Sequence, residues 1–274
     1  MADVVSRTHV YARIGGLPLE LDLHRPTDAG DPLPAVLYLH GGGWSVGRRS
    51  DRFAERVEPV VEQGLAVASV SYRLTDVARW PAQLHDVRTA VRWLRANASD
   101  LRLRADAIGA WGASAGGHLA LLAALAPGED AALRAVATFF APADLLALAR
   151  FRPGIDAPLP PVLDGRVPEP AFETRLLGAP PPEVPGRARD ASPVHWAGRA
   201  GSTRFLLVHG DADGLVPVDQ SRALHAALTG AGAEATLLLL GGADHEDPLF
   251  ERPAVLGAVG GFLRDALAAP PRLG

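Results

Sequence analysis

The segment AIGAWGASAGGHLALLAALA, residues 107–126, decides the fold. It begins as a short apolar run typical of a buried strand, 107–112, and continues as a helix of small and apolar residues, 114–126. The junction reads GASAG, a G-x-S-x-G pattern. In so sharp a turn, side chains two residues before and after the serine would collide, which requires glycine at both positions. The turn would raise the Ser114 hydroxyl above the sheet edge, at a helix N-terminus that favours developing negative charge.

Apolar runs and helical patterns alternate along most of the chain. The expected strands lie at 34–40, 65–72, 107–112, 133–140, 205–210 and 234–240, and the expected helices at 50–63, 81–98, 114–126, 218–231 and 252–268. Two stretches of alternating polarity, 8–14 and 17–24, predict an antiparallel hairpin at a sheet edge. Repeated strand–helix units predict an α/β fold, with a mostly parallel sheet of about eight strands and helices on both faces.

The segment from Phe151 to Pro193 interrupts this alternation, and it is rich in proline. Proline removes a backbone donor and blocks regular helix, so we expect an irregular insertion with one short helix at 169–177. We interpret the insertion at 151–193 as a lid over the functional site, with a surface loop as the alternative. Since no repeat or second core is visible, residues 1–274 are expected to form a single domain.

Composition and charge exclude several classes of protein. The chain has 274 residues, 48% of them hydrophobic, a net charge of −4 and no cysteine, which excludes disulfides, thiolate metal sites and a cysteine nucleophile. No basic stripe suggests nucleic acid as a partner. No apolar run approaches the roughly 20 residues of a membrane span. The N-terminus lacks the pattern of a signal peptide, so a cytoplasmic location is expected.

A second chemical signal follows the strand expected at 34–40, where the chain reads HGGGW, residues 40–44. Three glycines after a buried strand leave backbone N–H groups free and let a ligand approach closely. An oxyanion hole needs such preformed donors, aimed at the place where charge develops. We expect Gly42 and Gly43 to contribute to it, together with the N–H of Ala115.

Serine is a weak nucleophile without a base, and the chain has nine histidines. His245 is the expected base, because it lies in a polar loop, GGADHEDP, directly after the strand at 234–240. His118 is expected to pack within the helix after Ser114. His40 belongs to the glycine run at 40–44 and His209 closes the strand at 205–210, while the other histidines have no supporting motif.

A base of this kind needs a carboxylate that orients it and stabilises the imidazolium. Two candidates, Asp211 and Asp213, follow the strand at 205–210. Asp211 lies where the turn is still forming, so we expect it to hydrogen-bond backbone in the turn. Asp213 lies further into the loop and can reach His245, which makes it the preferred candidate for the acid.

These motifs together resemble the α/β-hydrolase superfamily, and more narrowly the esterases related to hormone-sensitive lipase and to bacterial acetyl and feruloyl esterases. The resemblance covers nearly the whole chain. It rests on HGGGW at 40–44, SYRL at 71–74, PAQLHDVRTAVRWLRANA at 81–98, WGASAGGHL at 111–119, DASP at 190–193, HGDAD at 209–213 with Val216-Pro217, and GADH at 242–245. In this family the acid is the later aspartate and the chain order is serine, acid, histidine. Many relatives have glycine where Asp244 stands.

The resemblance implies hydrolysis of a small carboxylic ester by Ser114, His245 and Asp213, with Gly42, Gly43 and Ala115 holding the oxyanion. It implies no metal and no cofactor. We expect a preference for short acyl or aryl esters, and Trp44, Tyr72 and Trp196 are candidates for the substrate pocket. The oligomeric state, monomer or homodimer, is left open by the sequence.

Two alternatives remain at this point. The same triad serves an amidase or formamidase acting on a small aryl-amide such as N-formylkynurenine. A binding protein of the same fold without catalysis is the more distant alternative, because such proteins usually lose a triad residue, and here all three positions are filled.

Overall fold

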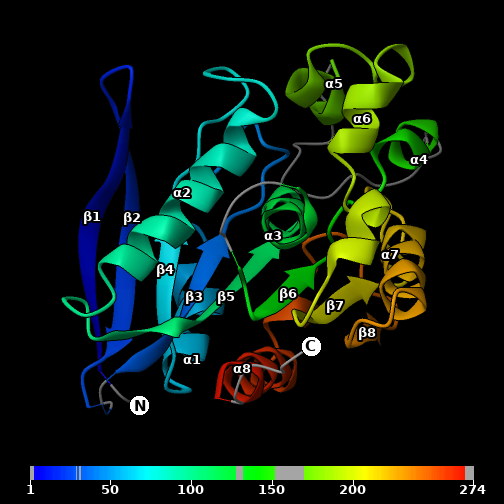
Figure 1. Ribbon diagram of the computed structural model, residues 1–274. Helices are drawn as coiled ribbons and strands as arrows, with labels where there is room; N and C mark the ends of the chain where they lie inside the picture. The colour runs from blue at the N-terminus through cyan, green and yellow to red at the C-terminus, as the bar shows by residue number, and fades with distance from the viewer. Residues whose placement is uncertain (1–2, 29, 31, 128–131, 152–169, 269–274) are drawn as a thin grey trace.

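Eight strands form one sheet in the order β1-β2-β4-β3-β5-β6-β7-β8 (Figure 1). The computed structural model describes residues 3–28, 30, 32–127, 132–151 and 170–268. The strands are β1 (Val4–Ile14), β2 (Leu17–Pro26), β3 (Leu33–Leu39), β4 (Ala66–Val70), β5 (Leu103–Ala113), β6 (Ala135–Phe139), β7 (Arg204–Gly210) and β8 (Ala235–Leu240). The β1–β2 and β2–β4 pairs are antiparallel, and the remaining neighbours are parallel. The mostly parallel sheet with a hairpin at one edge is therefore confirmed.

Helices cover both faces of this sheet (Figure 1). They are α1 (Glu58–Val61), α2 (Ala82–Ala96), α3 (Ala115–Leu125), α4 (Leu145–Arg150), α5 (Phe172–Leu177), α6 (Pro185–Asp190), α7 (Asp219–Gly230) and α8 (Pro253–Ala268), with shorter or irregular turns η1 (Phe53–Val57), η3 (Pro181–Glu183), η4 (Pro193–Arg199) and η5 (Pro248–Glu251). One apolar cluster joins the sheet to α2, α3 and α7, and a second joins its other face to α1 and α8. This is the layered arrangement of an α/β-hydrolase fold.

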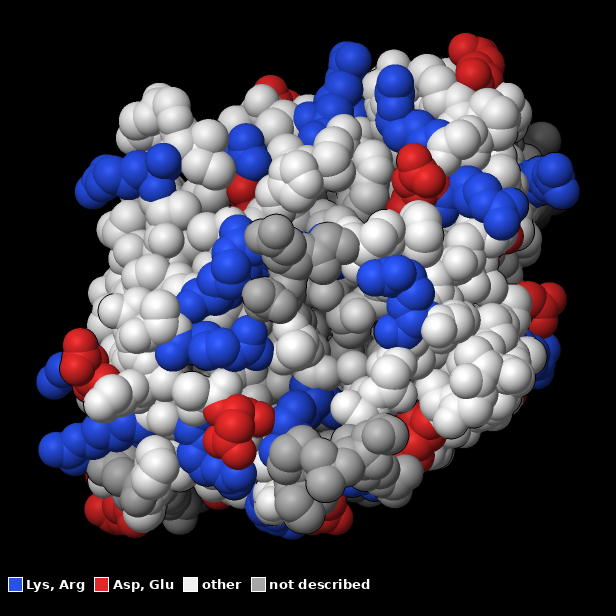
Figure 2. Space-filling view, viewed as in Figure 1, with Lys and Arg blue, Asp and Glu red and all other residues white. Residues whose placement is uncertain are grey.

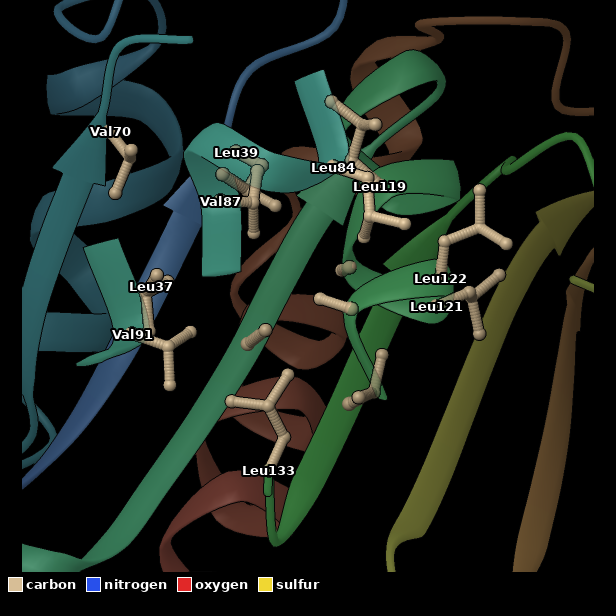
Figure 3. Packing of buried hydrophobic residues seen from close by; sticks show 14 of the residues in the cluster. Leu37, Leu39, Val70, Leu84, Val87, Val91, Leu119, Leu121, Leu122 and Leu133 are labelled. Carbon is tan, nitrogen blue, oxygen red and sulfur yellow. The ribbon is translucent and has the colours of Figure 1, made fainter. Parts of the chain in front are cut away.

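The first cluster is built from apolar side chains at helical spacing. Figure 3 shows Val87 and Val91 of α2 beside Leu39 and Leu37 of the sheet, and Leu84 of α2 near Leu119 of α3. All six side chains are at most 5% exposed. Their burial fixes α2 beside α3, the helix that begins immediately after Ser114.

The helix expected over 50–63 is shorter than predicted, and its first part is a π-helix, which is wider than an α-helix. Residues Phe53–Val57 form a π-helical turn and α1 continues only over Glu58–Val61. Pro59 explains the difference, because it has no N–H to donate to the carbonyl four residues earlier. The π turn directs Arg56 into the interior, where it is 1% exposed.

The insertion is more regular than the sequence predicted. The short helix expected at 169–177 is confirmed as α5, but η3, α6 and η4 begin with Pro181, Pro185 and Pro193. Proline suits the first turn of a helix, where its missing N–H would have no partner and its fixed φ is favourable. Residues 152–169 of the insertion lie outside the described residues. The described part lies with α4 beyond the carboxyl ends of the parallel strands (Figure 1).

Acidic and basic side chains are interspersed on the face shown in Figure 2, among larger uncharged areas. Within the described ranges, we find no helix that is both long enough and apolar enough to cross a membrane.

Candidate active site

Ser114 lies at the sharp turn between β5 and α3, with φ 50° and ψ −119°. This is a strained backbone conformation for a residue other than glycine. A Cβ on Gly112 would lie 2.4 Å from the carbonyl carbon of Gly116, and a Cβ on Gly116 would lie 2.0 Å from the carbonyl oxygen of Leu39. Both positions therefore require glycine, as the sequence predicted. A side chain at Gly112 would collide with the turn itself, and a side chain at Gly116 would collide with β3.

A continuous hydrogen-bonded chain joins Ser114 to His245 and Asp213. The Oγ of Ser114 is 3.0 Å from Nε2 of His245, and Nδ1 of His245 is 2.8 Å from Oδ2 of Asp213. The three residues are between 4% and 8% exposed. They come from three separate loops at the carboxyl ends of β5, β7 and β8. The arrangement lets His245 accept the Ser114 proton while Asp213 holds the opposite ring nitrogen.

The Asp213 carboxylate is stabilised in its ionised form. Burial acts to raise its pKa, but the charge of His245 and hydrogen bonds from His209 and His245 together lower the pKa below its usual range. Its second oxygen, Oδ1, accepts hydrogen bonds from the backbone N–H groups of Leu215 and Val216 at 2.9 and 2.7 Å. Asp213 is thus fixed by its own turn as well as by imidazoles.

The other two aspartates nearby bind backbone, and among the described residues neither is hydrogen-bonded to the imidazole of His245. Asp211 Oδ1 accepts from the N–H of Gly242 at 2.6 Å, in the loop after β8. We expected a bond within the turn of Asp211 itself, and the partner instead comes from the neighbouring loop. Asp244 Oδ1 accepts from the N–H groups of Gly214 and His245, at 2.9 and 2.7 Å. Both carboxylates therefore tie the acid turn to the histidine loop.

The glycine loop after β3 lies against the turn that carries Ser114. Gly42 and Gly43 have φ of 109° and 57°, values that glycine adopts without strain. A Cβ on Gly42 would lie 2.2 Å from the carbonyl oxygen of Val46. Ala115 follows Ser114 directly and is the first residue of α3. The N–H groups of these three residues are the candidate donors to an oxyanion.

The three aromatic residues considered for the substrate pocket lie in different places. Tyr72 is 4% exposed, stacks on His40 at 4.5 Å and donates its hydroxyl hydrogen to the carbonyl of His40 at 2.9 Å. Trp44 is 2% exposed and donates from Nε1 to Nδ1 of His118 at 3.2 Å. Trp196 donates to the carbonyl of Asp190 at 3.0 Å. Trp44 and Tyr72 thus pack against His118 and His40 inside the protein, with little surface left for a substrate.

Several residues beside the site were missed by reasoning from the sequence. His209 is buried, with Nε2 within 3.3 Å of Asp213 Oδ2 and 2.8 Å of the carbonyl oxygen of Val216. Phe172 of α5 lies over Gly43, where an added Cβ would be 2.2 Å from its ring. The buried Arg56 bonds Glu246, the residue after His245, at 2.8 Å. Only His209 had a sequence signal, since it closes the strand before Asp211 and Asp213.

Among the described residues, no group of three or more histidine, aspartate or glutamate side chains is arranged to hold a metal ion. The chemistry that the site offers is that of an activated hydroxyl beside backbone donors.

The model of the BD-FAE family matches residues 21–228. The chain belongs to the BD-FAE family. Among curated relatives, it is 30% identical over 231 residues to esterase LipQ of Mycobacterium tuberculosis, covering 80% of this chain and 52% of LipQ. It is 29% identical over 207 residues to esterase LipC of the same organism, covering 70% of this chain and 47% of LipC. This BD-FAE chain thus spans about half the length of the curated relatives it matches.

Solved structures share the fold of this BD-FAE protein over almost its full length. A truncated carbohydrate esterase from gut microbiota has a TM-score of 0.81 at 23% identity and covers 96% of this chain and 97% of its own. Esterase 2 of Thermogutta terrifontis, phosphorylated by paraoxon, has a TM-score of 0.76 at 25% identity and covers 97% of this chain and 96% of its own. The expected resemblance to α/β-hydrolase esterases is confirmed by these relatives and by the family.

Proposed function

We propose that this protein hydrolyses small carboxylic esters through a covalent acyl-enzyme on Ser114. The observation that carries the proposal is the buried chain of hydrogen bonds from Ser114 Oγ to His245 Nε2 at 3.0 Å and from His245 Nδ1 to Asp213 Oδ2 at 2.8 Å. Membership of the BD-FAE family and the similarity to esterases LipQ and LipC support an ester as the substrate.

In the proposed first step, Ser114 Oγ attacks the ester carbonyl carbon and its proton passes to Nε2 of His245. The negative charge that forms on the carbonyl oxygen is held by the N–H groups of Gly42, Gly43 and Ala115. The tetrahedral intermediate then collapses, and the bond to the alcohol oxygen breaks as that oxygen takes the proton from His245. The acyl group remains on Ser114.

In the second step, a water molecule gives a proton to His245 and attacks the acyl carbon. Collapse of this second tetrahedral intermediate breaks the bond to Ser114 Oγ, which recovers the proton from His245. Asp213 keeps Nδ1 protonated throughout and stabilises the positive imidazole that forms twice in each cycle. A carboxylate whose pKa is lowered suits this role, because it stays ionised beside the imidazole.

The proposal includes a preference for short acyl chains or aryl esters. Phe172 supports it, because its ring occupies the space that a side chain on Gly43 would fill and so limits the volume beside the glycine loop. We also propose that the chain forms a single domain in which the described part of the insertion, residues 170–193, covers the site as a lid. The hydrogen bond from Trp80 N–H to the Leu176 carbonyl, 2.9 Å long, supports this, since it ties α5 to the body of the protein. A cytoplasmic location stays a prediction.

A panel of p-nitrophenyl esters from acetyl to dodecanoyl tests the substrate class, with Ser114→Ala as the inactive control. We expect the highest kcat/KM for acetyl or butyryl esters. In Phe172→Ala, the optimum is expected to move towards longer chains because the space over Gly43 opens. A wild-type optimum at decanoyl or longer esters would contradict the preference.

N-formylkynurenine, added to the same panel, tests the amidase alternative. We expect slower turnover of this formamide than of p-nitrophenyl acetate. Faster turnover of the formamide would replace the ester by an aryl-amide as the substrate while keeping the same triad.

A further inference from the structure

The loop that carries His245 is also held by an ion pair whose arginine is buried. Arg56 Nη2 donates to Glu246 Oε2 at 2.8 Å and lies 3.2 Å from Glu251 Oε1. Arg56 is 1% exposed, and the side chains of both glutamates are 17% exposed. Its guanidinium also lies 6.0 Å from the centroid of Phe140, whose ring contacts the His245 ring edge-on at 4.5 Å. The Phe140 ring thus lies beside both the guanidinium of the ion pair and the imidazole of His245.

Glu246 itself lies beside the reacting groups. A Cβ placed on Gly41 would be 3.3 Å from Glu246 Oε1 and 3.5 Å from the Cβ of Ser114. Its backbone has φ 58°, in the left-handed region that is unfavourable for a residue other than glycine. Such a conformation persists only when its surroundings hold it. Arg56, together with Arg52 at 4.0 Å, holds the Glu246 side chain, so breaking the Arg56 bond would loosen the residue directly after His245.

Charge gives this carboxylate a second effect. Burial acts to raise the pKa of Glu246, but Arg56 lowers it below its usual range, so the carboxylate is ionised at neutral pH. A negative charge close to an imidazole favours its protonated form. The other titratable and charged groups that face His245 or this ion pair among the described residues are Asp213 and His209 on the side of β7, Asp244 in the same loop, Tyr38 of β3, Arg52 beside η1, and Glu251 of η5.

We propose that Glu246, held by Arg56, is a positioning residue that fixes the His245 loop and tunes how readily His245 takes a proton. This inference rests on the proposed hydrolase function. It gives Arg56 two effects, because the guanidinium anchors the carboxylate and also offsets part of its charge. The nucleophile and the base are thereby placed next to a carboxylate that is neither a ligand for substrate nor the acid of the triad.

The pH dependence of kcat/KM for p-nitrophenyl acetate tests the proposal, since the acid limb reports the group that must be unprotonated in the free enzyme. Glu246→Gln keeps the size of the side chain and removes the charge. We expect its acid limb to move to lower pH by about half a unit or more. Glu251→Gln is the matched control: it removes the other partner of Arg56, further along the chain from His245, and should move the limb by less than half as much.

Arg56→Gln is expected to move the acid limb in the opposite direction, to higher pH, because Glu246 loses its positive partner. Loss of fold alone does not produce opposite shifts in two variants. If Arg56→Gln does not fold, the pair Glu246→Gln and Glu251→Gln still decides. Identical profiles for wild type and Glu246→Gln, or equal shifts in both glutamate variants, would overturn the proposal. Absence of ester hydrolysis in wild type, or hydrolysis that survives in Ser114→Ala, would instead overturn the proposed hydrolysis through Ser114, so the two failures are distinguishable.

Discussion

Two carboxylates near His245, the buried Asp213 and the partly buried Glu246, have different partners. Asp213 accepts from the imidazole of His245 at 2.8 Å and lies 3.3 Å from that of His209. Glu246 is bonded to a guanidinium at 2.8 Å and also lies 4.0 Å from Arg52. The charge of Asp213 therefore acts mainly on the base, whereas the charge of Glu246 is largely offset by two arginines.

The difference explains how two carboxylates can be close to one base without both acting as its acid. An ionised group surrounded by imidazoles stabilises a positive charge that appears only during the reaction. The charge of an ionised group beside a permanent cation is largely offset, so its effect on the imidazole is smaller and acts together with its effects on loop position and stability. Proximity to His245 alone does not identify the acid. The other partner of each carboxylate, an imidazole or an arginine, distinguishes the two.

The largest expected effect comes from breaking the Asp213 side. Asp213→Asn leaves the shape intact but removes the charge and favours the wrong imidazole tautomer, so kcat should fall by roughly 10⁴-fold. Asp211→Asn is the matched control two residues earlier, since Asp211 binds only the Gly242 N–H in this region. Its kcat should stay within about threefold of wild type, because a cost of about 1 kcal/mol falls on stability instead. If only Asp211→Asn loses orders of magnitude, the assignment of the acid is reversed.

The next largest effect is a loss of stability when the ion pair between Arg56 and Glu246 is broken. Arg56→Gln removes the buried cation that the partly buried Glu246 and Glu251 share and leaves Arg52, which is 44% exposed, beside them. The loss of two charged hydrogen bonds should lower the free energy of unfolding by about 3–5 kcal/mol. Asp213→Asn should lower it by less than half as much, since Asn can still accept from the N–H groups of Leu215 and Val216. Urea unfolding followed by tryptophan fluorescence measures both. Equal losses in the two variants would remove the distinction between the two sides.

The smallest effect involves His118, an imidazole that is hydrogen-bonded to an indole and a backbone carbonyl. It accepts from Trp44 Nε1 and its Nε2 bonds the Ala191 carbonyl at 2.7 Å, so its neutral form fits the site. Burial lowers the pKa of His118 to about 4. Because the folded pKa lies below the unfolded one, the stabilisation is present above about pH 6.5 and is lost as pH falls towards 4, by up to about 3 kcal/mol.

Urea unfolding of wild type and His118→Asn at pH 7 and pH 4.5 measures this term. The variant should be less stable than wild type at pH 7 and should lose less stability on acidification. A loss on acidification that is the same in both proteins would assign the pH dependence to other groups.

Local patterns were sufficient to predict the sheet and the loops that bring the candidate triad together. Six apolar runs indicated the parallel strands, because such strands are mostly buried on both faces, and two alternating stretches indicated the antiparallel hairpin. Gly112 and Gly116 indicated the turn at Ser114, although a side chain at Gly116 would collide with β3 and not with its neighbours in the chain. The loops after β5, β7 and β8 meet because parallel strands end at one edge of the sheet, so Ser114, Asp213 and His245 could be expected to lie together.

What could not be predicted depends on distant contacts and on backbone detail. Arg56 and Glu246 are 190 residues apart, and each alone reads as an ordinary surface charge. The left-handed conformation of Glu246 has no local signal, since glycine would be the usual choice. Phe172 lies in the short helix that was expected at 169–177, but the sequence does not show what this helix packs against. The place of Phe172 over Gly43 follows only from tertiary packing.

The central claim is that Ser114 is a nucleophile activated by His245 and Asp213, and covalent labelling tests it most directly. The protein is treated with a fluorophosphonate, and intact mass followed by peptide mapping measures the adduct and its rate. We predict one adduct, on Ser114, formed at the wild-type rate in Asp211→Asn, orders of magnitude more slowly in Asp213→Asn, and not at all in Ser114→Ala. No adduct in wild type, or an adduct on another residue that abolishes ester hydrolysis, would contradict the account.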